Sequence, residues 1–247
     1  MVITSVNNPQ VKMWEKLKNK KFRDEHGLFV IQQSHLIEEA LKKNCVETLL
    51  VREGCDNPFA VEPVYVSDSV MKKICTNVSL NDCAAVCRKL TYDKPQSNSV
   101  IILENVQDPG NVGTIIRTAY SFGYDAVYLC EGCADEYNEK TIQSSQGAMF
   151  HIPVLRAGLS DTVNGLKKKG VHIVATSLDS SHFLKEAECH EKFALMFGNE
   201  GQGLSEAALS LADERIKIEM AAFESLNVAS AMAIAAYYYK NINCQKK

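Results

Sequence analysis

Residues 105–123, NVQDPGNVGTIIRTAYSFG, combine a break in the backbone with two polar side chains suited to ligand chemistry. An apolar, strand-like run at residues 100–103 leads into them, and proline and glycine precede a helix-like run from Thr114. We expect Asn111 in the turn and Arg117 in the first turns of the helix. The free N–H groups and positive end of such a helix favour an anionic or electron-rich ligand. An arginine nearby indicates phosphate or ribose binding.

A second cluster, residues 195–205 or LMFGNEGQGLS, has the same strand-to-helix form. The apolar run ends at Phe197, three glycines follow within six residues, and Glu200 stands at the centre of the turn. Glycines allow the backbone to approach a ligand closely, and Ser205 is placed to cap the next helix. The pattern is not the dinucleotide fingerprint G-x-G-x-x-G. Taken alone, it fits a plain connection as well as a binding loop.

A third cluster lies in residues 216–239, IKIEMAAFESLNVASAMAIAAYYY. Glu224, Ser225 and Asn227 precede a helix rich in small residues, and taken alone Ser225 or Asn227 is a helix N-cap. Residues 228–239 are apolar nearly all round, which predicts burial on more than one face, including a subunit interface.

Strands and helices alternate around these clusters, after a polar boundary at residues 93–99, DKPQSNS. Such alternation is typical of a parallel sheet with helices on both faces. We therefore predict two domains, residues 1–95 and 99–247. The predicted strands of the second domain are 100–103, 126–129, 171–176, 194–197 and 216–218. Its predicted helices are 114–122, 140–148, 159–168, 205–211 and 227–239.

The first domain has a mixed α/β pattern and a cluster of cations. We predict helices at 11–21 and 33–43, a helical turn at 69–74, and strands at 28–31 and 46–51. Residues 1–95 carry a formal charge of +2 and the remainder −5. The cations that crowd residues 12–23 can follow a phosphate backbone: Lys12, Lys16, Lys18, Lys20, Lys21 and Arg23. On charge alone, a solvated helix face is the better interpretation, and Trp14 among them is expected to anchor the helix.

Composition describes an ordinary globular chain. Of 247 residues, 46% are hydrophobic and 23% charged, and no apolar run is long enough for a membrane span. No secretory signal is visible, and nine scattered cysteines indicate a reducing cytoplasm. Cys130 and Cys133 form one C-x-x-C without a matching pair, which is weak evidence for zinc. The six histidines show no ligand spacing, so the sequence predicts no metal.

Taken in order, the three clusters resemble motifs 1, 2 and 3 of the SpoU (TrmH-like) branch of the SPOUT RNA methyltransferases. The resemblance covers roughly residues 99–240. The stretches ITSVNNPQVKMWEKLKNKKFRDEHGLFV and HLIEEALKK also resemble the substrate-binding domain that often precedes the catalytic domain in this family.

This resemblance implies an activity and a fold. Family members transfer a methyl group from S-adenosylmethionine to a ribose 2′-hydroxyl of structured RNA. The implied fold is α/β, with a small N-terminal L30e-like domain and a C-terminal parallel-sheet domain tied into a deep trefoil knot, an exception to unknotted topology. A homodimer is implied as well. With the front domain present, ribosomal RNA of the large subunit is a better expectation than tRNA.

The resemblance also assigns residues. The implied catalytic residues are Asn111, Arg117, Glu200, Ser225 and Asn227. The implied cofactor-binding residues are Thr176, Met196, Gly198, Ile218 and Leu226. The implied RNA-binding residues are Lys12, Lys18, Lys20, Lys21 and Arg23. We expect the three bends to converge on one pocket, with Arg117 stabilising the alkoxide and Glu200 orienting Arg117 or the asparagines.

Two departures from the family pattern leave alternatives open. In the third motif, Glu219 stands where the family has proline, and the loop at 221–223 is one residue short without its glycine. In the front domain, Gln32 and Gln33 replace an expected Glu-Gly. A catalytically silent RNA-binding homologue is therefore one alternative. Another is an α/β enzyme that uses LMFGNEGQG as a phosphate loop for a different nucleotide.

Overall fold

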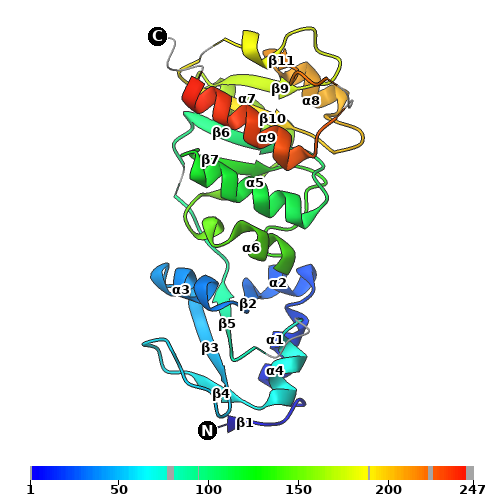
Figure 1. The fold of residues 1–247 in the computed structure, drawn as a ribbon. Helices are drawn as coiled ribbons and strands as arrows, with labels where there is room; N and C mark the ends of the chain where they lie inside the picture. The colour runs from blue at the N-terminus through cyan, green and yellow to red at the C-terminus, as the bar shows by residue number, and fades with distance from the viewer. Residues whose placement is uncertain (1, 77–80, 94, 189, 222–224, 243–247) are drawn as a thin grey trace. The chain divides into compact units, whose positions relative to one another are not determined.

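The computed structural model describes residues 2–76, 81–93, 95–188, 190–221 and 225–242. The chain divides into two compact units (Figure 1). Unit 1 contains Met1–Thr91 and Tyr137–Ile142, and unit 2 contains Tyr92–Glu136 and Gln143–Lys247. No helix within these described ranges is both long and apolar enough to cross a membrane.

Unit 1 is built on a mixed sheet with the strand order β1-β4-β3-β5-β2. Strand β5 runs antiparallel to β2 and β3, while the β1–β4 and β3–β4 pairs are parallel. Its strands are β1 (Val2–Ile3), β2 (Leu28–Ile31), β3 (Val46–Arg52), β4 (Val64–Val66) and β5 (Cys83–Arg88). Its helices are α1 (Pro9–Lys16), α2 (Lys20–His26), α3 (Ser34–Lys42) and α4 (Asp68–Ile74). Helix α6 (Glu139–Ser145) is divided between the units.

The predicted basic helix at residues 11–21 is wrong, because the chain forms two helices there. Helix α1 ends at Lys16, and Asn19 caps α2 by accepting a hydrogen bond from the Lys21 N–H. Asparagine competes for backbone hydrogen bonds and so favours such a cap over a helix interior. Trp14 is buried in the core of unit 1, as expected for an anchor.

Unit 2 is built on a six-stranded sheet in which every strand pair is parallel, in the order β11-β9-β10-β6-β7-β8. The predicted parallel sheet is confirmed. Its strands are β6 (Ser99–Leu103), β7 (Ala126–Leu129), β8 (Val154–Arg156), β9 (His172–Thr176), β10 (Phe193–Phe197) and β11 (Glu214–Ile216). Its helices are α5 (Pro109–Ser121), α7 (Leu159–Lys167), α8 (Glu206–Leu211) and α9 (Val228–Tyr237), with short turns at Ala148–Phe150, Leu184–Glu186 and Tyr238–Ile242.

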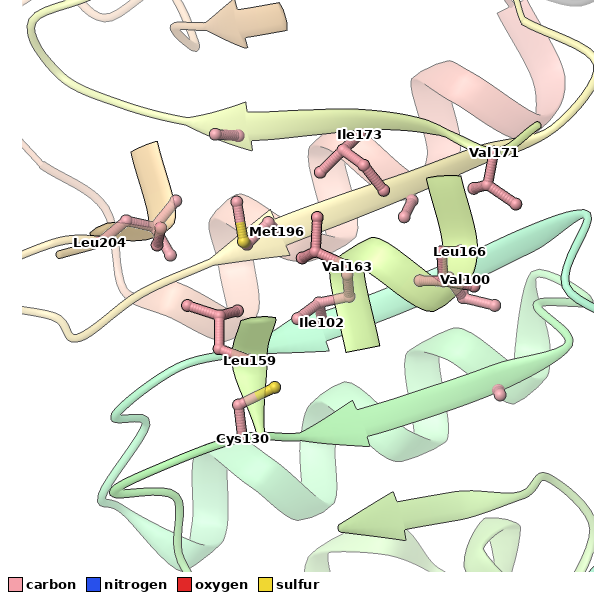
Figure 2. Packing of buried hydrophobic residues seen from close by; sticks show 14 residues of the cluster. Val100, Ile102, Cys130, Leu159, Val163, Leu166, Val171, Ile173, Met196 and Leu204 are labelled. Carbon is pink, nitrogen blue, oxygen red and sulfur yellow. The ribbon is translucent and has the colours of Figure 1, made fainter. Parts of the chain in front are cut away.

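Helices cover both faces of this sheet. Helices α5 and α9 lie side by side on one face, as Figure 1 shows. On the other face, Leu159, Val163 and Leu166 of α7 pack against the sheet (Figure 2). Ile102 and Met196 point toward α7, while the alternating neighbours in their strands face the other side. A sheet buried on both faces explains why its central strands read as continuous apolar runs.

Several boundaries differ from the predictions. Helix α5 begins at Pro109 rather than at residue 114, so Asn111 lies in the first helical turn. Strand β11 ends at Ile216, where the prediction placed its start. The helix predicted at 140–148 ends at Ser145, because Gln146 and Gly147 both have positive φ. Strands β1, β4, β5 and β8 were not predicted, since they are short or lack a period-2 pattern.

Candidate active site at the carboxyl edge of the sheet

The three sequence clusters meet at the carboxyl edge of the six-stranded sheet. The Glu200 carboxylate Oε1 accepts a hydrogen bond from the side-chain amide of Asn111. It also accepts one from Asn227 Nδ2 at 3.2 Å, and the same nitrogen donates to Asn111 Oδ1 at 3.1 Å. We call Asn111, Glu200 and Asn227 the amide–carboxylate cluster. The three bends therefore meet in space, as predicted. A cavity at this edge is lined by residues of the second and third clusters and not by residues 105–123, so the convergence of the bends on one pocket stays a prediction.

Helix starts hold two members of the cluster. Asp108 caps α5 by accepting a hydrogen bond from the Asn111 N–H at 2.9 Å, and Pro109 occupies the first helical position. Asn227 caps α9, since its Oδ1 accepts from the N–H groups of Ala229 at 3.0 Å and of Ser230 at 3.2 Å. The acceptor end of Asn227 is therefore committed to the helix, and its donor end faces Glu200.

The loop after β10 holds Glu200 and depends on glycine. A Cβ at Gly198 would overlap the backbone of Gly203 and Leu204, so only glycine fits there. Asn199 and Gly203 exchange two backbone hydrogen bonds of 2.9 and 2.8 Å, which close the loop. Gly203 has a φ of +70°, a value that L side chains rarely adopt. The loop is thus a closed hairpin with Glu200 at its tip.

Side chains that were not predicted join this loop to the end of β6. Asn199 Nδ2 donates to the Asn105 carbonyl at 3.1 Å, and Asn199 Oδ1 accepts from the N–H groups of Gly201 and Gln202. The Glu104 carboxylate accepts from the Ser205 N–H at 2.8 Å and from its hydroxyl at 2.7 Å. In the sequence, the polar residues that follow strands β6 and β10 could have indicated these contacts.

A cavity of about 290 Å³ lies against the glycine loop. The predicted residues Thr176, Gly198, Ile218, Ser225 and Leu226 line it. Backbone from the glycine loop forms one part of its wall, and apolar side chains form another: Leu178, Leu204, Leu209, Ile216 and Met220. Such a mixture suits a ligand with a flat apolar part and polar edges.

Comparison with known proteins identifies the family. Residues 98–237 match the SpoU rRNA Methylase family. The chain belongs to this family. Residues 8–85 match the MRM3-like substrate binding domain. The curated 23S rRNA (guanosine(2553)-2′-O)-methyltransferase RlmP of Bacillus subtilis is 38% identical, over 96% of this chain and 98% of the relative.

Solved structures agree with this membership. A crystal structure of an RNA 2′-O ribose methyltransferase has a TM-score of 0.80 and 30% identity, covering 96% of this chain and 97% of that one. An AdoMet-bound rRNA methyltransferase from Sinorhizobium meliloti has a TM-score of 0.84 and 27% identity, covering 96% of each chain. The resemblance to SpoU enzymes drawn from three motifs is confirmed.

Two SpoU assignments made from sequence lie elsewhere than expected. Met196 does not line the cavity: its side chain is buried in the core, and its carbonyl accepts the Thr176 hydroxyl at 3.0 Å. Arg117 is exposed and lies six positions after Asn111, which places it about 120° around α5. Within the described ranges, its guanidinium makes no hydrogen bond to the amide–carboxylate cluster. Among the described residues, Glu200 therefore bonds the two asparagines and not Arg117.

The third SpoU motif is only partly described. Residues 222–224, which include Glu224 and most of the shortened loop, lie outside the described residues. Glu219, in place of the family proline, lies 3.6 Å from Lys185 as an exposed ion pair. Gln32 and Gln33, the departure in the front domain, are described: Gln32 is buried and bonds Thr76 and Asn81.

The cations assigned to RNA in unit 1 differ from one another. Lys12 and Lys21 are exposed. Lys20 pairs with Asp24 at 2.5 Å, and Lys18 donates to the Lys73 carbonyl at 2.8 Å. Arg23 is only 5% exposed, and its Nη1 donates to the carbonyls of Leu17 and Lys18 at 2.8 Å. The Arg23 guanidinium therefore closes the turn between α1 and α2, which argues against the predicted contact with RNA.

The C-x-x-C pair is part of the interior of unit 2. Burial raises the pKa of the Cys130 thiol to about 12, and the Cys133 thiol donates to the Leu103 carbonyl at 3.2 Å. Metal ligands and nucleophiles need the thiolate form, which these surroundings disfavour. The two cysteines therefore pack and bond locally.

Proposed function

We propose that the chain transfers a methyl group from S-adenosylmethionine to a ribose 2′-hydroxyl of large-subunit ribosomal RNA. The observation that carries this proposal is the amide–carboxylate cluster, which joins all three SpoU motifs beside the glycine-lined cavity. The sequence relation to RlmP favours ribosomal RNA over tRNA.

The cavity fits the cofactor in its chemistry. At about 290 Å³, it lies near the lower end of the range of about 300–1,000 Å³ for small-molecule sites. Ile218 and Leu226 offer apolar surface to a purine ring, and the loop at Gly198 offers backbone groups at close approach. When bound, the cofactor supplies a methyl group on a sulfonium.

The residues of the chain position the ribose and stabilise the charge that develops on it. Glu200 accepts from both asparagines, so it fixes the direction of the Asn111 and Asn227 amides. Two fixed amides can hold ribose oxygens without adding charge, which favours in-line geometry at the methyl carbon. Arg117 stabilises the developing alkoxide as a cation, since a guanidinium does not accept a proton. Ser225, at the wall of the cavity, completes the site.

Assembly and substrate contact belong to the same proposal. Residues 1–95 form the RNA-binding domain and residues 99–247 the catalytic domain, tied into the family's trefoil knot. The chain is cytoplasmic and pairs as a homodimer. Exposed apolar side chains on α5 and α9 support the pairing. Tyr120, Ile234 and Tyr237 are 45%, 44% and 50% exposed. Lys12 and Lys21 contact RNA phosphates.

A methylation assay with labelled S-adenosylmethionine tests the function directly. Deproteinised 23S rRNA, assembled large subunits and bulk tRNA, each from cells lacking the gene, are offered separately, and modified riboses are mapped. We expect label at one ribose of large-subunit RNA. Label on tRNA alone contradicts the substrate, and label on a base contradicts the reaction.

A second candidate, a silent RNA-binding homologue, is favoured by Glu219 and the shortened third motif. Calorimetry with S-adenosylmethionine separates it from an active enzyme. Heat of binding with a stoichiometry near one per chain supports the enzyme. RNA binding without any cofactor binding supports the silent homologue. A site that binds ATP but not S-adenosylhomocysteine supports the remaining alternative, an α/β enzyme that uses LMFGNEGQG as a phosphate loop for a different nucleotide.

A further inference from the structure

Two histidines and a glutamate lie together at the amino edge of the six-stranded sheet, opposite the active-site edge. His172 is the first residue of β9, and Glu214 is the first residue of β11. His190 belongs to the segment that leads into β10. One ligand atom from each of the three residues lies within 4.8 Å of the others.

The register of the sheet brings these side chains to one face. Glu214 pairs with Val174 in the parallel β9–β11 ladder, and His172 lies two residues before Val174. Side chains two apart on a strand point the same way, so His172 and Glu214 share a face. The His172 N–H donates to the Lys192 carbonyl at 2.9 Å, which brings the segment of His190 alongside.

The two facing polar atoms lack hydrogen bonds. His172 Nε2 and Glu214 Oε2 are both buried, and neither has a hydrogen-bond partner among the described residues. They lie 3.7 Å apart, too far for a hydrogen bond. Buried polar atoms normally have partners, and leaving one without a partner is costly. Two buried ligand atoms without partners at this separation indicate a site for a bound cation between them.

A tetrahedral zinc ion matches this separation and this donor set. Zinc binds imidazole nitrogen and carboxylate oxygen at about 2.0–2.2 Å, so two of its ligand atoms in a tetrahedron lie about 3.3–3.6 Å apart. Two histidines and one glutamate with a fourth position open is an established zinc-ligand set. We propose that His172, His190 and Glu214 bind one Zn²⁺ ion at the amino edge of the sheet.

The surroundings are compatible with a cation. Lys167, Lys169 and Lys192 line the hollow beside His172 and His190. Lys167 pairs with Asp213 at 2.6 Å, so its charge is matched, and Lys169 donates to the Ser97 hydroxyl at 3.0 Å. The His190 ring stacks on His172 with 3.6 Å between centroids. To share an ion with His172, the half-buried His190 ring turns out of this stack. Binding then joins three chain segments, the starts of β9 and β11 and the entry to β10.

The ion has a structural role because its ligands lie at the edge opposite the amide–carboxylate cluster. It fastens the segment before β10, the strand whose far end carries the glycine loop. Zinc should therefore raise the thermal stability of unit 2 whether or not methyl transfer occurs. Measurements of zinc binding need no methyl transfer, so their outcome is independent of the proposed function.

The experiment uses the full chain, stripped with a chelator and titrated with Zn²⁺ in a calorimeter and with Co²⁺ in a spectrophotometer. We expect one ion per chain, and cobalt d–d bands of a tetrahedral site without the thiolate-to-cobalt charge-transfer band. Glu214→Gln and His190→Gln should weaken binding at least about 100-fold, since even indirect partners of metal ligands contribute about 10–100-fold. His182→Gln, which changes an exposed histidine outside the cluster, is the control and should bind normally.

Three results overturn the proposal: no binding, a thiolate band that assigns the ion to cysteines, or full affinity in both ligand variants. Should the variants unfold, the unaltered chain gives the answer. Zn²⁺ is then expected to protect His172 and His190, but not His182, from acylation by diethyl pyrocarbonate. Equal modification of all three with and without zinc also refutes the site.

Discussion

The carboxyl edge of the sheet and the α1–α2 segment of unit 1 were both marked by the sequence as sites of chemistry, and they differ in how they are assembled. At the edge, Asn111, Glu200 and Asn227 come from three distant segments and still meet. In the α1–α2 segment the cations are close together in sequence, yet Arg23 is buried while Lys12 and Lys21 are exposed.

The difference lies in what positions each side chain. In a parallel sheet, the carboxyl ends of neighbouring strands share one edge, so residues that follow β6 and β10 must be close. A run of charges has no such rule, because helix phase and breaks decide which side chains face water. Position after a strand is therefore better evidence for a site than proximity in sequence.

The largest expected effect is from Arg117→Ala, which tests the predicted catalytic cation, a residue outside the cluster. Loss of the cation should lower the rate of methyl transfer about 10²–10³-fold, as for other groups that stabilise an oxyanion. Binding of S-adenosylmethionine, measured by calorimetry, should not change. Lys168→Ala removes an exposed cation on the far helix layer and is the control. A normal rate in Arg117→Ala excludes the proposed role.

Gly198→Ala tests whether the carboxyl edge depends on a closed loop. Its Cβ would overlap the Gly203 backbone, so the loop must open, at a cost of about 3 kcal/mol in the free energy of unfolding. Cofactor binding should be lost with it. Urea unfolding and calorimetry measure the two effects.

The matched control is Gly165→Ala in α7, where nothing lies within 4 Å of the added Cβ. A helical alanine there should raise stability by up to about 1 kcal/mol. If both variants behave alike, the glycine loop is not the constraint that the geometry indicates.

Substitutions in the α1–α2 segment should separate into two kinds. Arg23→Met removes buried hydrogen bonds from a charged donor, so the free energy of unfolding should fall by about 1.5–3 kcal/mol. Lys12→Ala with Lys21→Ala should leave stability within about 0.5 kcal/mol. The double variant should weaken RNA binding and reduce its salt slope by about 0.9 for each phosphate that the protein no longer neutralises.

Unfolding curves and RNA titrations at several salt concentrations measure this division. Unchanged RNA affinity in the lysine double variant contradicts their assignment to phosphates. A stable Arg23→Met variant with weak RNA binding would restore Arg23 as an RNA-binding residue on the surface.

Most of unit 2 was predictable, because apolar runs in a sheet covered on both faces are long and their ends carry glycine or proline. The strand at Ala126–Leu129 was predicted to the residue. Strand β8, with three residues and an exposed Arg156, gave no comparable signal. The start of α5 was misplaced because proline and glycine at 109–110 were interpreted as a turn, whereas Asp108 makes them a first helical turn.

The residues of the site could be predicted from the sequence, but the hydrogen bonds between them could not. Motif order identified the three cluster residues, but nothing in the sequence shows that Glu200 bonds asparagines and not Arg117. The sequence did not show that the Met196 side chain points into the core, because one step along a strand reverses the direction of a side chain. His172 and Glu214 are 42 residues apart, so only the β9–β11 register reveals them as a pair.

The smallest expected effect concerns Asp24, whose ion pairs with Lys20 and Lys89 make a small contribution to stability. Hydrogen bonds from Lys20 and then Lys89 lower the pKa of Asp24 from 3.8 to about 2. A lowered pKa stabilises the fold above pH 3.8, and this contribution disappears as the pH falls toward 2. Because the pair is exposed, its contribution is at most about 1 kcal/mol.

Asp24→Asn should therefore lose a little stability at neutral pH and show a shallower decline between pH 4 and 2. Freed from its partner, Lys20 becomes available to phosphate, so RNA binding should strengthen slightly at low salt and converge with the unaltered chain at high salt. Side-chain carboxyl NMR gives the Asp24 midpoint directly, and a value near 3.8 would show that both ion pairs are broken in solution. Stronger RNA binding together with weaker stability would establish that Asp24 competes with RNA phosphate for Lys20.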